Sequence, residues 1–484
     1  MLPNKTQCLV FLLAALSGGI MAVAPAQPAA PAEGTQAGAS RPNVVLIVID
    51  AFRVDRIFAS NHGVPVMPFL SRFAADSLQF VDAMSPEAWT KPSMASIYTS
   101  LHADAHGVQS GAKYMLEPDE APESADALPA AIPNIATFLK AAGYDTVGVQ
   151  TNPNLQARFG FANGFNRYTF LKGSPGIFVT PEVLGEIQKA KAPFFLYVHY
   201  FDPHAPYLAL PPYNEAFGGM PQPPPQEEAL LLERQVDFCR DLDRFCLGLT
   251  DKHAFPPLSA QGNAYLRRCY DVECRLVDDQ IRQLVEALAA QSENTLIVVT
   301  ADHGEELWDH GELGHGKTAY GEVLHVPLLF HHPGRLPGKA DTTPVGTIDI
   351  LPTVAGFLGL PPDARWQGVN RLQAQAGLPA QVQFSQCRGA FPGFPRDFGV
   401  AKIGPDKLVL DRKKNTALLF DVVQDPGETK NLAEARPEKV AELRRLLEEH
   451  TARMKSVCQS LPHEVGALDD ETKQAINALG YLAK

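Results

Sequence analysis

Short uninterrupted runs of branched apolar residues recur along the chain and predict buried strands. They cover residues 44–49, 146–149, 194–198, 295–300 and 326–330. A continuous apolar run, rather than strict alternation with polar residues, is typical of a strand covered on both faces of a parallel sheet. The pattern therefore predicts a central sheet that lies between layers of helices.

Between these runs, apolar residues recur at helical spacing and predict helices. The predicted helices cover residues 68–77, 93–100, 135–142 and 264–290. The proline-rich stretch within residues 208–262 predicts an irregular insertion. Strands that alternate with helices favour an α/β fold with a mostly parallel central sheet flanked by helices.

The pattern changes after about residue 375. Residues 400–410 and 417–423 alternate like antiparallel strands, and residues 437–454 have the spacing of a charged amphipathic helix. We therefore predict a main domain over residues 41–375. A small C-terminal α+β subdomain is predicted over residues 376–484.

The N-terminus has the pattern of an export signal. Lys5 precedes an apolar run over residues 8–24, and Ala24-Pro25-Ala26 resembles a cleavage site. We predict a signal peptide over residues 1–26 and a disordered leader over residues 27–40, which indicates a periplasmic or secreted protein. An uncleaved membrane anchor is the alternative. No later run is long and apolar enough to span a bilayer, so stable membrane insertion after cleavage is not expected.

Composition narrows the range of partners. The formal net charge is -12 and charged residues make up 20% of the chain. Nucleic acids and anionic membrane surfaces bind basic faces, so this charge disfavours both as general partners. A local basic pocket for a small anionic substrate remains compatible with it. The oligomeric state stays open.

The cysteines suggest disulfide bonds. Of the seven cysteines, Cys8 lies in the predicted signal peptide, which leaves six. An even number in an exported chain favours disulfides, although the pairing stays open. The clustering of the first four of them between residues 239 and 274 predicts a stapled local insertion. The six are Cys239, Cys246, Cys269, Cys274, Cys387 and Cys458.

Thr90 is the candidate nucleophile. Pro92 follows closely and favours the start of a helix, so Thr90 is expected just ahead of a helix N-terminus. Free backbone N–H groups and the helix dipole favour an anion there. A hydroxyl at that point, beside Lys91, can attack a phosphoryl or sulfuryl group. The alternative is that Thr90 simply caps the helix.

Candidate metal ligands lie at the ends of predicted strands. Asp50, Asp302 and His303 directly follow buried runs, and ligands in such sheets collect at the carboxyl ends of strands. Together with the Thr90 hydroxyl they form a mixed oxygen and nitrogen site for one divalent ion. Carboxylates suit Mg²⁺, Mn²⁺ or Ca²⁺, and an imidazole adds Zn²⁺ to the choice.

Three further side chains complete the predicted chemistry. Thr90 would form a covalent ester with the transferred group. His204 would protonate the leaving oxygen, while His315 or Lys317 would bind the remaining oxygens. His199, at the end of a predicted strand, is interpreted as structural.

Several motifs together resemble the sulfatase family of the alkaline phosphatase superfamily. The resemblance runs in the same order from about residue 41 to residue 482. The motifs include Arg41–Asp50, Trp89–Ser93, His199–Tyr207, Thr300–Glu305, Gly314–Gly316 and Asp425–Glu428.

The resemblance implies an alkaline-phosphatase-like fold, a metal held by Asp50, Asp302 and His303, a nucleophile at position 90, and His204 as a substrate or leaving-group histidine. Family sulfatases carry Cys or Ser at position 90, which is oxidised to formylglycine. Threonine cannot give that aldehyde, so no formylglycine is expected.

Other positions also depart from the family pattern. Met94 and Ala51 stand where the family often has arginine and aspartate. Gln150-Thr151-Asn152-Pro153 replaces a segment that contains a sulfate-binding lysine. Asn152 and Lys91 are therefore further candidates for substrate binding.

These departures favour phosphate over sulfate chemistry. Threonine nucleophiles resemble those of the superfamily's phosphodiesterases and phosphoethanolamine transferases. We expect a metal-dependent hydrolase of phosphate esters, possibly diesters, that acts through Thr90. The alternatives are a sulfate-ester hydrolase without formylglycine, a phospho-group transferase, and a binding protein that has lost the chemistry.

Overall fold

The computed structural model describes residues 41–110, 124–233, 258–373, 382–388 and 396–467. The predicted signal peptide and leader lie outside these residues. Residues 41–484 cluster into one compact unit.

The centre of the fold is an eight-stranded sheet in the order β14-β4-β13-β10-β1-β9-β7-β8. Strand β1 (Asn43–Ile49) lies between β10 (Thr295–Ala301) and β9 (Phe194–Tyr200), parallel to both. Strands β7 (Asp145–Gln150) and β8 (Arg167–Phe170) extend the parallel part. Every residue of β1, β9 and β10 is buried, as their continuous apolar runs predict.

The other edge of the sheet contains antiparallel pairs. Strand β13 (Leu328–His331) runs antiparallel to β10, and β4 (Leu78–Phe80) runs antiparallel to β13. Strand β14 (Lys339–Asp341) pairs in parallel with β4 at the edge. The sheet is therefore mostly parallel, and the predicted fold class is confirmed.

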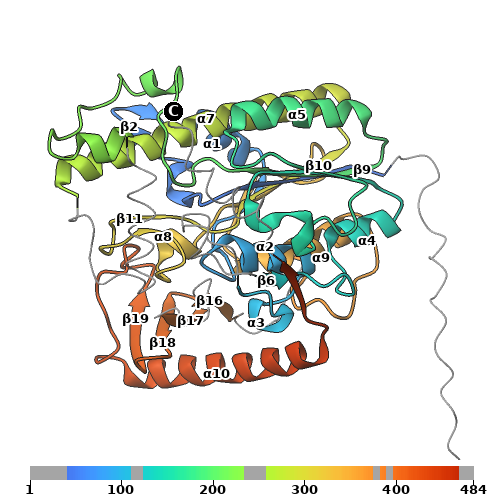
Figure 1. The fold of residues 1–484 in the computed structure, drawn as a ribbon. Coiled ribbons are helices and arrows are strands. Elements are labelled where there is room, and N and C mark those ends of the chain that lie inside the picture. The colour runs from blue at the N-terminus through green and yellow to red at the C-terminus, as the bar shows by residue number, and fades with distance from the viewer. Residues whose placement is uncertain (1–40, 111–123, 234–257, 374–381, 389–395, 468–484) are drawn as a thin grey trace, which may run out of the picture. The chain divides into compact units, whose positions relative to one another are not determined.

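Helices cover both faces of this sheet (Figure 1). On one face lie α1 (Pro68–Ala75), α5 (Gly176–Lys189) and the long α7 (Ala260–Gln291). On the other lie α2 (Thr90–Thr99), α4 (Ile135–Ala141) and α9 (Ile350–Phe357). Helix α7 follows the predicted insertion, which contains short helical turns at Tyr213–Glu215 and Ala229–Glu233.

A four-stranded antiparallel sheet forms the C-terminal part. Strands β16 (Gln383–Arg388), β17 (Asp397–Ile403), β18 (Asp406–Asp411) and β19 (Thr416–Asp421) pair in sequence order. Helix α10 (Pro437–Ser460) lies along this sheet in Figure 1. The predicted run 400–410 is thus two strands, because the chain turns at Gly404, whose φ is +56°.

Short elements complete the description. They are the helices α3 (Ala103–His106) and α8 (Gly321–Leu324), the 3₁₀ turns Val54–Arg56, Pro153–Leu155, Ala157–Phe159 and Thr347–Asp349, and the strands β2 (Ser60–Asn61), β3 (Val64–Pro65), β5 (Ala83–Met84), β6 (Ser124–Ala127), β11 (Glu306–Leu307), β12 (Leu313–Gly314), β15 (Val345–Gly346) and β20 (Glu464–Ala467).

The expected disulfides are not found among the described residues. Cys269 and Cys274 both lie on α7, where each is buried, and no disulfide joins them to Cys387 or Cys458. Cysteines five positions apart on one helix do not face each other, which explains why they do not pair. Cys239 and Cys246 lie outside the described residues.

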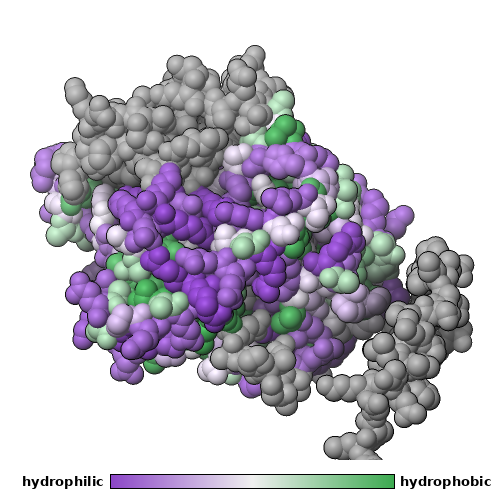
Figure 2. Space-filling view, turned by 90° about the horizontal axis from the view of Figure 1, so that it is seen from below, coloured by the Kyte–Doolittle hydropathy of each residue, from purple (hydrophilic) through white to green (hydrophobic). Residues whose placement is uncertain are grey.

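None of the helices in the described residues is long and apolar enough to cross a bilayer. On the face drawn in Figure 2, hydrophobic side chains form small separate patches among hydrophilic ones.

Helix α10 packs through a buried histidine. The His450 ring stacks on Phe384 with centroids 3.8 Å apart and contacts the edge of His102 at 4.4 Å. His450 is 7% exposed. Burial, together with nearby positive charge, lowers its pKa to about 2, so the ring is neutral in the folded protein.

We therefore expect the protein to lose stability as the pH falls below about 6.5, the ordinary histidine pKa, because the unfolded chain then binds a proton that folded His450 does not. Between pH 6 and 5, the free energy of unfolding should fall less steeply in His450→Phe than in wild type. The two slopes should differ by about 1.4 kcal/mol per pH unit. Urea unfolding at several pH values measures this. The control is His463→Gln, whose wild-type side chain is 60% exposed. Equal slopes for His450→Phe and wild type would contradict the account.

Candidate active site

The register of the central sheet brings the first site residues together. Ile49 pairs with Ala301 on one side and with Tyr200 on the other. Asp50 and Asp302 therefore leave neighbouring strands at the same edge. The backbone N–H of Ala51 donates a hydrogen bond of 3.3 Å to Asp302 Oδ1, which closes the link.

Two buried carboxylates this close repel each other. Asp50 and Asp302 are both fully buried. Burial and the charge of Asp302 raise the pKa of Asp50 well above its usual range. The pair can stay ionised only if a cation lies beside it, because buried like charges are otherwise very costly. The sheet thus creates a strongly cation-attracting position.

Thr90 faces this position from helix α2. The helix begins at Thr90 itself, with Trp89 as its N-cap, so the expectation that Thr90 precedes the helix was wrong by one or two residues. Thr90 Oγ1 lies 3.4 Å from Asp50 Oδ1 and 3.2 Å from His303 Nε2. All ten residues of α2 are buried.

Two serine hydroxyls, one in α2 and one in the segment ahead of it, bond to the end of β10. Ser93 Oγ, in the first turn of α2, donates a 2.6 Å hydrogen bond to the carbonyl oxygen of Asp302. Ser85 Oγ donates a 2.5 Å bond to the same carbonyl. Thr90 is therefore held at a fixed place relative to Asp302.

The donor set fits a divalent cation. His303 Nδ1 lies 2.8 Å from the carbonyl oxygen of Gly304, so Nδ1 carries the proton and Nε2 keeps its lone pair. That Nε2 lies 3.5 Å from Asp302 Oδ2 and 3.6 Å from Asp50 Oδ1. Asp302 Oδ2 is buried without a hydrogen-bond partner. These donors suit a divalent ion.

His199 belongs to the same group, contrary to its interpretation as structural. Ligand atoms of Asp50, His199 and Asp302 all lie within 4.8 Å of one another. His199 Nε2 is buried without a hydrogen-bond partner, 3.8 Å from Asp50 Oδ2. Its Nδ1 contacts Thr151 Oγ1 at 3.1 Å. The available signal was its place on a strand that ends at the same sheet edge as Asp50.

Asn152 orients both the metal position and the hydroxyl. Its Nδ2 donates a 2.8 Å hydrogen bond to Asp50 Oδ2 and lies 3.4 Å from Thr90 Oγ1. Its Oδ1 accepts a bond from the backbone of Asn154, which fixes the amide's direction. Asn152 thus contacts Asp50 and Thr90, the residues predicted as a metal ligand and the nucleophile.

The imidazole ring of His303, in this centre, is followed by those of His315 and His204. The His315 ring lies 4.2 Å from the His303 ring and 4.9 Å from the His204 ring, between centroids. His315 Nδ1 lies 2.9 Å from Glu305 Oε1, and Glu305 is fully buried. Burial lowers the pKa of His204 to about 3. His315 Nδ1 thus faces a carboxylate, whereas His204 Nδ1 lies 2.6 Å from the carbonyl oxygen of Ala205.

The two lysines are placed differently. Lys317 is buried next to the site, where its Nζ donates a 2.9 Å hydrogen bond to the carbonyl oxygen of Leu313. Lys91 is buried apart from the group, with Nζ 3.9 Å from the centroid of the Phe159 ring. One residue further along a helix points about 100° away, so Lys91 cannot share the direction of Thr90. Burial lowers the pKa of Lys91 to about 7.

The chain is similar in sequence to a known family of proteins. Residues 42–360 match the family model described as Sulfatase. An uncharacterized sulfatase, YidJ, of Escherichia coli K12 is 27% identical over 263 residues, which cover 52% of this chain and 49% of that protein. A multifunctional alkaline phosphatase superfamily protein, PehA, of Trinickia caryophylli is 25% identical over 399 residues, covering 66% of this chain and 74% of the relative.

Solved structures show the same fold. A phosphonate monoester hydrolase from Silicibacter pomeroyi superposes with a TM-score of 0.66 at 23% identity, covering 87% of this chain and 97% of that one. By sequence, the chain spans about half the length of the first two curated relatives, YidJ and an endo-4-O-sulfatase of Bacteroides thetaiotaomicron.

The buried charges give a test of metal binding. We expect Mn²⁺, Zn²⁺ or Ca²⁺ to raise the melting temperature of the chelator-treated protein, because about 2.7 kcal/mol of stabilisation follows when free metal is roughly 100 times its Kd. Asp302→Asn should lose most of this gain. In chelator the same variant should be more stable than wild type, since one of two repelling charges is gone.

Calorimetry and metal content after dialysis measure both effects. Asp363→Asn is the matched control, because that carboxylate is paired with Arg365 in an exposed contact far from the site in sequence. Equal stabilisation of Asp302→Asn and wild type by metal would show that Asp302 is not a ligand.

Proposed function

Because this chain belongs to the sulfatase family, we propose that it is a metal-dependent hydrolase of phosphate esters that acts through a covalent ester on Thr90. The observation that carries the proposal is the position of the Thr90 hydroxyl between Asp50 and His303, at 3.4 Å and 3.2 Å. A threonine that only capped a helix would have no need of this contact with candidate metal ligands.

Threonine at position 90 determines the type of nucleophile. Its side chain is a secondary alcohol with a methyl group, which cannot be converted to the formylglycine aldehyde. The attacking atom is therefore the hydroxyl oxygen itself. Direct attack by a threonine oxygen produces an ester that water must cleave in a second step.

Asp50, Asp302, His303 and His199 would hold the divalent ion. When bound, the ion would lower the pKa of a nearby hydroxyl and offset the negative charge that develops on the transferred group. Asn152 would hold the side chains of Asp50 and Thr90 in fixed positions relative to each other through its two contacts. We propose one ion.

The reaction then proceeds in two displacements. Thr90 Oγ1 forms a bond to phosphorus while the bond from phosphorus to the leaving oxygen breaks, and the hydroxyl proton passes to Asp50, which already accepts its hydrogen bond. The leaving oxygen takes a proton from a histidine. Water next attacks phosphorus, its proton returns to that histidine, and the Thr90 oxygen leaves and recovers its own proton.

His315 is the favoured proton donor. Its contact with Glu305 stabilises the protonated ring, whereas burial keeps His204 neutral. His204, which touches His315, would then contact the leaving group rather than protonate it. Lys317 would add positive charge beside the transferred group. Lys91, directed at Phe159, is not assigned a role in binding substrate.

The charge near the site favours a substrate with a single negative charge. Lys317 lies near Glu305, whose charge it offsets, while Met94 is neutral and Lys91 points elsewhere. Phosphodiesters, phosphonate monoesters and sulfate esters carry one charge, and phosphate monoesters carry two near neutral pH. The similarity to a multifunctional alkaline phosphatase superfamily protein and to the fold of a phosphonate monoester hydrolase supports this class.

Three alternatives remain distinct. A sulfate-ester hydrolase without formylglycine would use the same residues, and the sulfatases among the relatives favour it. A phospho-group transferase would replace water by an acceptor alcohol. A binding protein would hold the ester without cleaving it. In each case the partner is a small anionic ester, and we propose that the protein is exported to the periplasm or secreted.

The nucleophile is tested with matched aryl esters. We expect a phosphodiester and a phosphonate monoester to turn over faster than a phosphate monoester or a sulfate. Thr90→Ala should lower kcat by at least about a thousandfold, since the covalent route is lost. Thr90→Ser should retain measurable turnover because it keeps the hydroxyl. If Thr90→Ala turns over at wild-type rates, the covalent mechanism is wrong; if only the sulfate reacts, the sulfatase alternative is correct.

The proton donor is tested with leaving groups of different basicity. We expect His315→Asn to lose about 100-fold or more in kcat for alkyl leaving groups but much less for 4-nitrophenol, which needs no proton. His204→Asn should lower kcat for both substrates by similar factors. The reverse pattern in steady-state kinetics would assign the proton to His204.

A further inference from the structure

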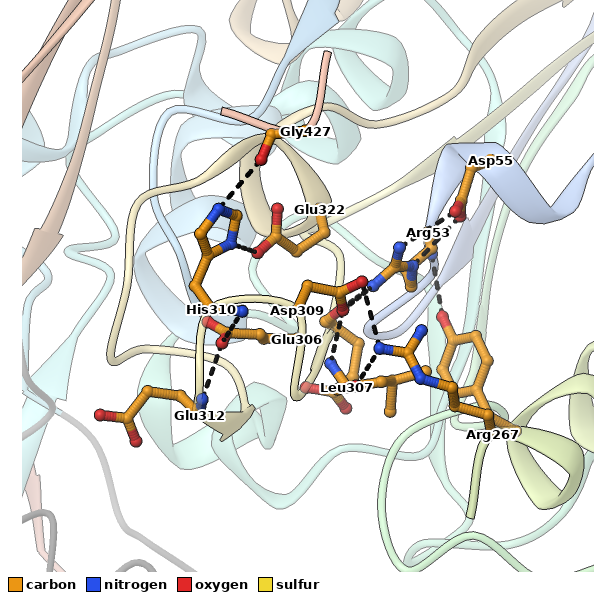
Figure 3. Close-up of polar contacts among 12 residues, drawn as sticks. Arg53, Asp55, Arg267, Glu306, Leu307, Asp309, His310, Glu312, Glu322 and Gly427 are labelled. Atoms are coloured by element: carbon orange, nitrogen blue, oxygen red, sulfur yellow. Dashed lines mark hydrogen bonds and ion pairs between the residues drawn. The ribbon is translucent and has the colours of Figure 1, made fainter. Parts of the chain in front are cut away.

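The hairpin of β11 and β12 carries His315 into the site, and one buried carboxylate organises its turn. Glu306 Oε1 accepts hydrogen bonds from the backbone N–H groups of His310, at 2.9 Å, and Glu312, at 2.8 Å. Its Oε2 accepts a 2.8 Å bond from Thr318 Oγ1. The turn therefore has a defined shape (Figure 3), but Glu306 does not connect it to other parts of the protein.

Two adjacent side chains at the turn, Asp309 and His310, connect the hairpin to other parts of the protein. Asp309 contacts Arg53 at 2.6 Å and Arg267, on α7, at 3.2 Å. His310 contacts Glu322, on α8, at 2.6 Å and the carbonyl oxygen of Gly427 at 3.0 Å. Figure 3 shows the two groups on opposite sides of the turn. His310 is thus a link from the hairpin to the C-terminal subdomain.

The partners of His310 fix its protonation state. Nδ1 faces a carboxylate and Nε2 faces a backbone carbonyl, and both of these groups only accept hydrogen bonds. Both ring nitrogens must therefore carry protons, which makes the ring a cation. Burial alone would lower the pKa of His310, but the hydrogen bond and charge of Glu322 raise it above the ordinary value.

The charged surroundings of His310 agree with a cationic ring. The Tyr320 ring stacks on it, with centroids 3.6 Å apart and planes 6° apart. The charged groups that act on it are Glu306 from β11, Glu322 from α8 and Asp425 from the C-terminal turn, whereas the peptide of Gly427 and Glu428 faces it only through a backbone carbonyl.

The same side chains do not form a convincing metal site. Ligand atoms of Glu306, His310 and Glu322 lie within 4.8 Å of one another. However, both nitrogens of His310 and both oxygens of Glu306 already take part in hydrogen bonds within the protein. A metal would have to displace several of these bonds.

We propose that His310 is a positioning residue: as an imidazolium it fastens the β11–β12 hairpin to α8 and to the turn at Gly427, and thereby sets where His315 lies in the active site. Arg396 reinforces the link, because it donates a 2.9 Å bond to the carbonyl oxygen of Lys317 and contacts Glu312. Only the part of the inference that concerns turnover rests on the proposed function.

The protonation state is measured by NMR on full-length protein with labelled histidine rings, with His310→Gln used to assign the signal. We expect both His310 nitrogens to be protonated and the ring to titrate above the ordinary midpoint of about 6.5. Glu322→Gln should lower the midpoint by about one pH unit or more. A ring with one protonated nitrogen at pH 6, or a midpoint unaffected by Glu322→Gln, overturns the proposal.

The positioning role is measured by hydrogen–deuterium exchange of residues 305–317. Exchange there should be several-fold faster in His310→Gln than in wild type and unchanged in the control His463→Gln. If His310→Gln does not fold, Glu322→Gln replaces it, since that variant keeps the ring and removes the charge. Unchanged exchange over 305–317 overturns the proposal.

Turnover gives the functional readout. In His310→Gln, kcat for the alkyl ester should fall about tenfold or more while 4-nitrophenyl ester turnover falls less, because a displaced His315 delivers its proton poorly. Equal losses for both esters overturn the assignment to His315. If wild type cleaves no ester at all, the proposed function fails, and the NMR and exchange results still decide the link.

Discussion

The repulsion between Asp50 and Asp302 is the constraint on which the site depends. Parallel pairing of β1 with β10 forces both carboxylates to the same buried edge. Folding therefore produces a local excess of negative charge, and no lysine or arginine in the described part of the chain forms an ion pair with either carboxylate. Lone pairs of His303 and His199 face the same position, and together these features define a place for an ion rather than a place for water.

Two further elements, helix α2 and the β11–β12 hairpin, bring candidate catalytic residues to that position. Helix α2 brings Thr90 from one side and is attached to the carbonyl oxygen of Asp302 through Ser93. The β11–β12 hairpin brings His315 from another side, held in place by contacts with α8 and the C-terminal subdomain. The small antiparallel domain thus contributes to the geometry of a site to which its strands supply no candidate catalytic side chain.

Much of this could be predicted because buried parallel strands have a clear sequence pattern. The apolar runs gave β1, β9 and β10, and the polar residues that follow them had to meet at one edge. Asp50, Asp302 and His303 were predicted as metal ligands in this way, and the structure places their side chains close together. The antiparallel direction of β13 could not be predicted, because a short apolar run carries no information on strand direction.

The errors have equally local causes. His199, at the end of a predicted strand, was interpreted as structural, and the pairing of β9 with β1 shows that its ring lies near Asp50. Lys91 was expected near the substrate because it is adjacent to Thr90 in sequence, but helical geometry directs its amine to Phe159. The cysteine count favoured disulfides, yet Cys269 and Cys274 are core residues of α7.

The complete burial of all ten residues of α2 has a consequence for how substrate preference can change. A substitution in α2 would disturb the protein core as well as the candidate nucleophile. We therefore expect a change of substrate preference to arise more readily in surface loops than in this helix.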